Sequence, residues 1–299
     1  MINLFTLGRC SAGGWCDGKT FHQCLSGTYN LFTGSTALAD CVKCPPGYYC
    51  TGPGVIAFNS SVCGTGHYCP AATKYAKQFP CPAGTYNPNI NRTSIIDACV
   101  TCPAGYFCPQ GTSGLTNSCP RGYYCPEGTG AGTRYACPLG TYSGALGLVN
   151  STQCVDCPVG HYCPDGSSGQ PSMAPMPCRP GSYNPHTKTG YVLNCRPCSA
   201  GFSCPSAGQN ASTDPCMEGY YCPNGTITNT QFPCPPGRFT NSTSLTRPEE
   251  CTPCPPGFSC NWATGFPTSP WQPCRQGHFC PQGTISCLFF RCYLNAYYR

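Results

Sequence analysis

Apolar residues follow no helical period and no long alternating period before residue 285 of this 299-residue chain. Aromatic side chains instead recur singly, at a fixed distance from cysteine. The sequence C-x-x-G occurs fifteen times, and thirteen copies carry Tyr, Phe or Trp five residues after the cysteine, as in Cys44-Pro-Pro-Gly-Tyr-Tyr-Cys50. This pattern predicts short hairpins as the most regular structure, with no amphipathic helix.

The cysteines define two kinds of module, which both open with C-x-x-G. In the short module the second cysteine comes six residues after the first, and in the long module it comes seventeen or eighteen residues after. The short modules are Cys10–Cys16, Cys44–Cys50, Cys63–Cys69, Cys102–Cys108, Cys119–Cys125, Cys157–Cys163, Cys198–Cys204, Cys216–Cys222, Cys254–Cys260 and Cys274–Cys280. The long modules are Cys24–Cys41, Cys81–Cys99, Cys137–Cys154, Cys178–Cys195 and Cys234–Cys251. Cys287 and Cys292 fall outside this scheme.

The modules follow one another in the order short, short, long. This order predicts a partial repeat at 10–43, repeats at 44–101, 102–156, 157–197 (with one short module fewer) and 198–253, a partial repeat at 254–284, and an atypical tail at 285–299. A fixed period indicates an array in which each unit contacts mainly its neighbours. The apolar tail is either a genuine cap or a mistranslated end of the gene, and the chain as a whole is interpreted as a fragment of a longer secreted protein or an incomplete gene model.

Composition explains what stabilises such an array. The chain holds 32 Cys, 36 Gly and 34 Pro, but Leu, Ile, Val and Phe together number only 42. So few aliphatic residues cannot form a conventional core for this length, so disulfides must supply the stability. On the chain-entropy model a bridge across seventeen residues contributes about 3 kcal/mol and one across six roughly 2 kcal/mol. The predicted fold is an elongated array of small disulfide-rich repeats, with little regular secondary structure, short β-hairpins and no large hydrophobic core.

The residues of the module have separate roles in this fold. The glycine three residues after the first cysteine fits a turn that needs a positive φ, and the frequent proline after the cysteine presets its own φ. The aromatic residues are expected to pack over a neighbouring disulfide. The linkers, such as Pro109-Gln-Gly-Thr112 and Pro126-Glu-Gly-Thr129, are typical turns.

Fifteen modules allow more than one pairing of their cysteines. The unit 157–197 lacks a short module and leaves the remaining cysteines in phase, so the simplest scheme closes each module on itself, as in Cys44–Cys50. A shifted scheme with Cys50–Cys63 and Cys69–Cys81 survives the same deletion, but it needs a strained C-x-x-C bridge. An interleaved scheme that joins Cys44 to Cys63 and Cys50 to Cys69 would need re-pairing in the short unit.

The compartment follows from the cysteines and from the N-x-[ST] sequons. So many thiols are typical of an oxidising compartment, and sequons point the same way. We therefore expect an extracellular or cell-surface protein that carries N-linked glycans. The six candidate glycosylation sites are Asn59, Asn91, Asn150, Asn210, Asn224 and Asn241.

Several kinds of function are disfavoured. The net charge of +6 is scattered, which argues against nucleic-acid binding, and no apolar run is long enough to span a membrane. No nucleophile elbow or phosphate loop is present, so we expect no enzyme and no cofactor. Zinc bound at the C-x-x-C pairs is an alternative to disulfides, which we disfavour. His67, His161 and His278 take a position that Tyr fills in other modules and therefore suit packing, whereas His22 and His186 have no evident partner.

The motif C-P-x-G-x-[YF], followed by about a dozen residues and C-x-x-C, resembles the ephrin-receptor-like cysteine-rich repeat, which is related in style to the tumour-necrosis-factor-receptor module. Long modules such as Cys81-Pro-Ala-Gly-Thr-Tyr86 … Cys99-Val-Thr-Cys102 carry the resemblance, which covers residues 10–284. It implies a bridge between Cys81 and Cys99. The doubled short module departs from that family. Long arrays of this kind also resemble protist surface and filament proteins, including mastigoneme glycoproteins.

Two non-enzymatic functions are compatible with this sequence. The first is a structural glycoprotein, a disulfide-stapled rod that self-associates, or joins other extracellular structural proteins, into a surface filament or coat. The second is a receptor-like or adhesive ectodomain that binds a protein or glycan ligand through divergent modules. The divergent positions are Ser203 and Ser259, where the second aromatic is missing, with Trp262 and Trp271 beyond them.

Overall fold

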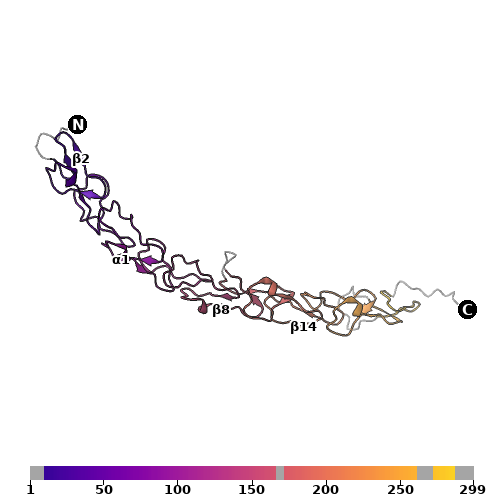
Figure 1. Cartoon of the computed structure of the whole chain (residues 1–299). Coiled ribbons are helices and arrows are strands. Elements are labelled where there is room, and N and C mark those ends of the chain that lie inside the picture. Colours follow the sequence, from indigo (N-terminus) through magenta and orange to yellow (C-terminus); the bar gives the residue numbers. More distant parts are fainter. Residues whose placement is uncertain (1–9, 166–171, 261–271, 287–299) are drawn as a thin grey trace, which may run out of the picture. The chain divides into compact units, whose positions relative to one another are not determined.

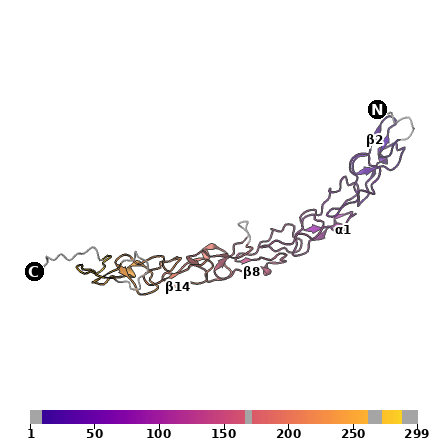
Figure 2. The same cartoon turned by 180° about the vertical axis from the view of Figure 1, so that it is seen from behind.

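A computed structural model describes residues 10–165, 172–260 and 272–286. Trp262, Trp271 and residues 287–299 of the tail lie outside these ranges. The chain forms two compact units, Met1–Cys137 with Ser143–Cys154, and Pro138–Tyr142 with Val155–Arg299. Both are chains of small repeated units with little regular secondary structure, as predicted, and short arrows separated by irregular chain are visible in both views (Figure 1, Figure 2).

The described strands are two or three residues long and pair as nine antiparallel two-stranded sheets. In long modules the pairs are β3 (Thr28–Tyr29) with β4 (Val42–Lys43), β5 (Thr85–Tyr86) with β6 (Val100–Thr101), β7 (Thr141–Tyr142) with β8 (Val155–Asp156), β11 (Ser182–Tyr183) with β12 (Arg196–Pro197), and β15 (Arg238–Phe239) with β16 (Thr252–Pro253). In short modules they are β1 (Gly14–Cys16) with β2 (Phe21–Gln23), β9 (His161–Tyr162) with β10 (Met176–Pro177), β13 (Phe202–Ser203) with β14 (Asp214–Pro215), and β17 (Phe258–Ser259) with β18 (Gln272–Pro273).

The hairpins and the single β-bridges that lie outside the named strands share one pairing register. The residue four after the first cysteine of a module pairs with the residue just before the first cysteine of the next module. In long modules this pair is Thr85 with Thr101, and in short modules it is Tyr48 with Val62. The pairing recurs from the first module to the fourteenth. Long and short modules therefore share one hairpin register.

The glycine of each C-x-x-G turn has the predicted positive φ. All fifteen of these glycines have φ between 75° and 89°, a conformation that L side chains rarely adopt. Gly84, at φ 89°, leads directly into strand β5. The turn is therefore identical in short and long modules, and it starts every hairpin in the same way.

A short helical turn closes each long loop just before its second cysteine. These turns are η2 (Leu38–Asp40), α1 (Ile95–Ala98), η3 (Ser151–Gln153), η5 (Val192–Asn194) and η6 (Pro248–Glu250). Ser94 and Asp97 form a capping box around α1, because the Asp97 carboxylate accepts hydrogen bonds from the Ser94 hydroxyl (2.6 Å) and backbone N–H (2.7 Å). The N–H of Cys99 donates to the carbonyl of Ile95 at 3.0 Å, which ends the turn at the disulfide.

Acid should loosen the α1 capping box. Hydrogen bonds from the Ser94 hydroxyl, followed by those from the backbone of Ser94 and Thr93, lower the Asp97 pKa from 3.8 to about 2. Because the folded pKa lies below the unfolded one, the stabilisation is complete above about pH 4 and is lost as the pH falls towards 2. We expect an NMR titration of the Asp97 carboxyl carbon to show a midpoint near 2. A midpoint near 3.8 would mean that the box does not form.

The interior consists almost entirely of cystine. Apart from Ala98, Leu148, Phe239 and Leu245, every fully buried apolar residue in the described ranges is one half of a disulfide. The expected packing of an aromatic residue, five after the first cysteine, against a neighbouring bridge is found at Tyr124, Tyr221 and Phe239. Tyr124 lies against Leu148 and the disulfide of the following module. The described chain thus has no large hydrophobic core, and each disulfide forms the centre of a separate small cluster.

Candidate functional site

Fifteen disulfides join thirty cysteines, and each lies within one module. Ten span six residues and five span seventeen or eighteen, which is the set of pairs in the self-closing scheme. The two cysteines of each C-x-x-C therefore belong to different bridges. In the described residues no three His, Cys, Asp or Glu side chains gather in a way that could hold a metal ion.

Backbone hydrogen bonds, not disulfides, connect one module to the next. In the first fourteen modules the turn glycine donates its N–H to the module that follows and accepts a bond from that module's first cysteine. Gly84 illustrates this: its N–H donates to the carbonyl of Cys108 (2.8 Å), and its carbonyl accepts from the N–H of Cys102 (2.9 Å). We call this recurring set of bonds the inter-module ladder.

The long linkers that follow short modules add bonds to the preceding module. After Cys69, the N–H of Ala72 donates to the carbonyl of Cys44 (2.9 Å), and the carbonyl of Thr73 accepts from the N–H of Cys50 (3.0 Å). The carbonyl of Ala72 also lies 2.5 Å from where a Cβ on Gly27, two modules earlier, would be. Because turn glycines such as Gly27 lack a Cβ, a backbone carbonyl from two modules further along, in a linker or a long loop, can approach them closely.

The predicted linker turns fit this arrangement through their threonines. In Pro109-Gln-Gly-Thr112 the hydroxyl of Thr112 donates to the carbonyl of Pro109 at 2.5 Å. Its backbone carbonyl accepts from the N–H of Asn87 at 3.0 Å. The hydroxyls of Thr73, Thr129, Thr226 and Thr284 donate to their own prolines in the same way. The threonine therefore closes the turn and positions a carbonyl for the ladder.

One linker position always has a left-handed backbone. It is usually glycine, as at Gly111 and Gly128. The long loops have the corresponding position, recognised by an N–H that donates to the first cysteine of the preceding module, so the four described non-glycine residues with positive φ are Ala72 in a linker and Asn91, Lys188 and Ser244 in long loops. A non-glycine residue has a steric cost here of about 1–2 kcal/mol.

Replacing Ala72 with glycine should therefore stabilise the linker, even though it removes a methyl group. Ala72 has φ 65°. The relief of about 1–2 kcal/mol exceeds the roughly 0.4–1 kcal/mol lost to the greater freedom of unfolded glycine. We expect slower hydrogen exchange of the amide of residue 72, which donates to Cys44. Ala71→Gly, one residue away and without a positive φ, should accelerate it instead.

The residue that replaces the second cysteine in long modules was not predicted from the sequence. Six residues after the first cysteine these modules carry Asn30, Asn87, Ser143, Asn184 or Thr240, and all five are buried. Their carbonyls accept from the turn glycine of the preceding module, as those of the second cysteines do. Applying the six-residue spacing of the short modules to the long ones would have identified these positions.

In three long modules a buried asparagine takes the place of a bridge. The side-chain amide of Asn87 donates to the carbonyl of His67 (2.9 Å) and its oxygen accepts from the N–H of Asn89 (2.9 Å). Asn184 bonds to the carbonyl of His161 (2.8 Å) and to the N–H of His186 (3.1 Å). Asn30 uses its amide and oxygen in the same way. These side chains therefore connect two modules and also fix the following turn.

The histidines at the tyrosine position take part in packing and backbone pairing. His67 pairs with Pro80 in the hairpin register, and its Nδ1 lies 3.0 Å from the carbonyl of Thr65. His161 does the same with Val159, at 2.9 Å. His186, for which the sequence showed no partner, lies 3.2 Å from Nη2 of Arg196.

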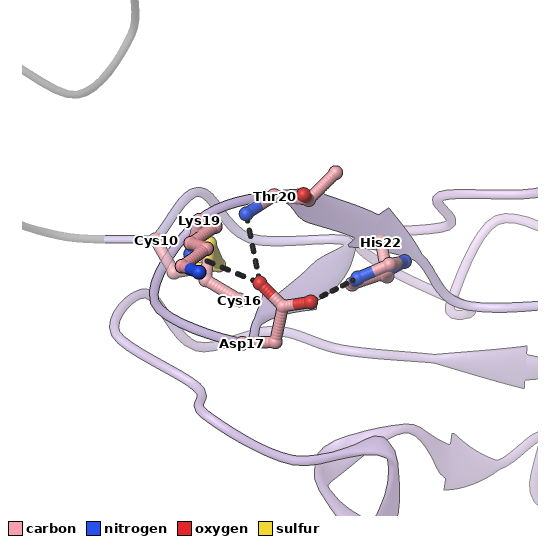
Figure 3. A network of polar contacts seen from close by, with 6 residues as sticks. All are labelled: Cys10, Cys16, Asp17, Lys19, Thr20 and His22. Carbon is pink, nitrogen blue, oxygen red and sulfur yellow. Dashed lines mark hydrogen bonds and ion pairs between the residues drawn. A yellow bond between two sulfur atoms is a disulfide. The ribbon is translucent and has the colours of Figure 1, made fainter.

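His22 also has partners that the sequence did not reveal (Figure 3). Its Nε2 lies 3.0 Å from Oδ2 of Asp17, and its ring stacks on Trp15 with the ring centres 4.4 Å apart. Oδ1 of Asp17 accepts from the N–H groups of Lys19 and Thr20. These bonds, that from His22 first, lower the Asp17 pKa to about 2. The group closes the turn between β1 and β2.

Exposed apolar side chains occur on several described modules, and the first long module carries four of them. Leu25, Leu31, Phe32 and Leu38 are 70%, 49%, 72% and 59% exposed. Ser203 and Ser259, by contrast, are almost fully buried, so they cannot form the divergent binding face for which the sequence suggested them. Most other described modules carry a half-buried aromatic side chain at this position.

No protein-family model matches this chain, and no curated protein matches its sequence. In the part of the chain that the structure describes, no helix is long and apolar enough to cross a membrane.

Proposed function

We propose that this chain is a non-enzymatic structural segment of an extracellular glycoprotein that assembles into a surface filament or coat, in the manner of mastigoneme glycoproteins. Its partners are further copies or other extracellular structural proteins. The observation that carries the proposal is the uniformity of the modules. The same turn, hairpin register and ladder recur along the described chain, and thirty cysteines are bridged as an oxidising compartment allows.

The sequon side chains support the glycoprotein part of the proposal. All six sequon asparagines are exposed. The oxygen of Asn150 accepts from the N–H and hydroxyl of Thr152, and that of Asn224 accepts from the N–H of Ala200. These bonds use the oxygen and leave the nitrogen, which carries the sugar, to face solvent. The buried Asn87 and Asn184, which are not in sequons, use their nitrogen internally.

Glycosylation can be tested one site at a time. In protein secreted by a eukaryotic host, we expect Asn150→Gln and Asn224→Gln each to remove the mass of one N-glycan. The matched control is Asn89→Gln, which changes an exposed asparagine outside any sequon. An unchanged mass in both sequon variants, with the wild type also free of glycan, would contradict the prediction.

Electron microscopy of native material tests the structural function itself. We expect ordered polymers of regular width that persist without reductant. Dispersed monomers that bind a soluble ligand would overturn the proposal and favour the receptor-like alternative.

The exposed apolar residues of the first long module specifically favour that alternative, an adhesive or receptor-like ectodomain. Solvent-exposed Leu31 and Phe32 stand where the fifth long module carries the sequon Asn241-Ser-Thr, so this loop faces outward in both modules. If the alternative holds, Leu31→Ser with Phe32→Ser should abolish ligand binding. Ile96→Ser, which changes an even more exposed apolar residue on α1, should not.

A further inference from the structure

The disulfides divide the chain into segments that tension can reach and segments that it cannot. A bridge carries load directly from one cysteine to the other, so the residues enclosed between them are shielded. After each long module only two residues precede the next bridge, as with Val100–Thr101. After the short modules the linkers are much longer. Those described throughout are the seven-residue linker 17–23 and the linkers of ten to twelve residues at 51–62, 70–80, 109–118, 126–136, 205–215 and 223–233.

A small and constant set of backbone contacts holds each long linker in place. In the linker 70–80, Ala72 and Thr73 bond to the preceding module, and the carbonyl of Phe79 accepts from the N–H of Tyr68 (3.0 Å). Pro80 pairs with His67, and the N–H of Cys81 donates to the carbonyl of Gly66.

The linker 126–136 repeats this set at the corresponding residues. Gly128 and Thr129 bond to Cys102 and Cys108, the carbonyl of Tyr135 accepts from the N–H of Tyr124, and the N–H of Cys137 donates to Gly122. The bonds of the linker 126–136 reach the module that it follows and the one before it. Those of the linker 70–80 reach the corresponding two modules and also Thr51 of the preceding linker, whose hydroxyl donates to the carbonyl of Lys74 at 3.1 Å. Among the described residues, no disulfide crosses between modules. One linker can therefore open without opening the rest of the array.

We propose that the array is an extension-limited mechanical element. Under tension the linkers after the short modules open one by one, while the long modules and the C-x-x-C connections stay closed. The disulfides set how far the chain extends, because five residues in each short loop and sixteen or seventeen in each long loop remain out of reach. This inference does not rest on the proposed filament, since it follows from the connectivity of a single chain.

The proposal fixes the size of each step. Linkers of ten to twelve residues extend by about 35–45 Å at roughly 3.3–3.6 Å per residue. The distance that the linker already covers when folded reduces this, so we expect increments of roughly 20–40 Å. A cooperative domain of this length would instead release several hundred ångströms in one event.

Single-molecule force spectroscopy on the full chain, held by its two ends, tests the proposal. Without reductant we expect a series of small increments. With reductant, the total contour length should rise by about 450 Å, which is the length of the enclosed residues at roughly 3.4 Å each. A single all-or-none extension, or equal lengths with and without reductant, would overturn the proposal.

Double variants that each remove one disulfide show how much that disulfide limits the extension of the chain. Removing a long bridge with Cys81→Ala and Cys99→Ala should lengthen the unreduced chain by about 60 Å, and removing a short one with Cys44→Ala and Cys50→Ala by about 20 Å. Neither variant leaves a free thiol at the altered bridge. If either fails to fold, the wild-type comparison with and without reductant still decides. Equal gains from the two variants would contradict the assignment.

Discussion

Replacing Gly84 with alanine is expected to open the array at that module, at a cost of about 2–4 kcal/mol. Two effects combine. Gly84 has φ 89°, which an L side chain adopts at a penalty, and its Cβ would overlap the carbonyl oxygen of Gly128 and lie 3.2 Å from the carbonyl carbon. Backbone atoms cannot move aside as a flexible side chain can. The linker that contains Gly128 must therefore shift and lose its bond to Cys102.

Hydrogen exchange of the Gly84 and Gly128 amides measures this opening, because both donate to cysteine carbonyls in the ladder. Gly114→Ala is the matched control: that glycine has no positive φ and nothing lies within 4 Å of its Cβ position. The control should change stability by less than about 0.5 kcal/mol. Similar exchange in the two variants would show that close approach at the turn glycine does not hold the modules together.

The second large effect is expected for Asn87→Ala, at roughly 2–3 kcal/mol. Asn87 is fully buried, and the substitution leaves the His67 carbonyl and the Asn89 N–H without these partners. Asn87→Asp distinguishes the contributions of the two hydrogen bonds, because it keeps the acceptor for the Asn89 N–H but removes the donor to the His67 carbonyl. Both variants should speed exchange of the Gly66 amide, which donates to the carbonyl of residue 87.

Asn89→Ala is the control for this pair, since the side chain of Asn89 is exposed and only its backbone N–H takes part in the contact. We expect an effect of less than about 0.5 kcal/mol. If Asn87→Ala were equally mild, the buried asparagine would merely fill space in the long module and would not replace a bridge.

The local unit was predictable from the sequence because it depends on a few residue types with strict requirements. Only glycine suits the turn at φ 75–89°, so the C-x-x-G repeat located each turn, and the hairpins follow from it. Aromatic packing over disulfides was also predictable, as at Tyr124, because little else apolar is available.

The contacts between modules could not be predicted in this way. The ladder uses backbone groups, such as the N–H of Cys102 and the carbonyl of Gly84, which nearly every residue possesses and no composition reveals. The left-handed position was not evident from the sequence, because Ala72 occupies it in a linker and Lys188 in a long loop, where other modules have glycine. The role of Asn87 was not evident for a different reason: it lies six residues after Cys81, where a short module has its second cysteine, but asparagine shows no chemical likeness to cysteine.

Disulfide mapping tests most directly whether each module closes on itself and no disulfide joins neighbouring modules. Trypsin cleaves after Lys77 and Arg92, so the peptide 78–92 holds Cys81 as its one cysteine. After removal of N-glycans and without reduction, this peptide should be linked to 93–121, and fragmentation should identify Cys99 as the partner. A link to 44–74, which holds Cys69, would establish the shifted scheme and contradict self-closing modules.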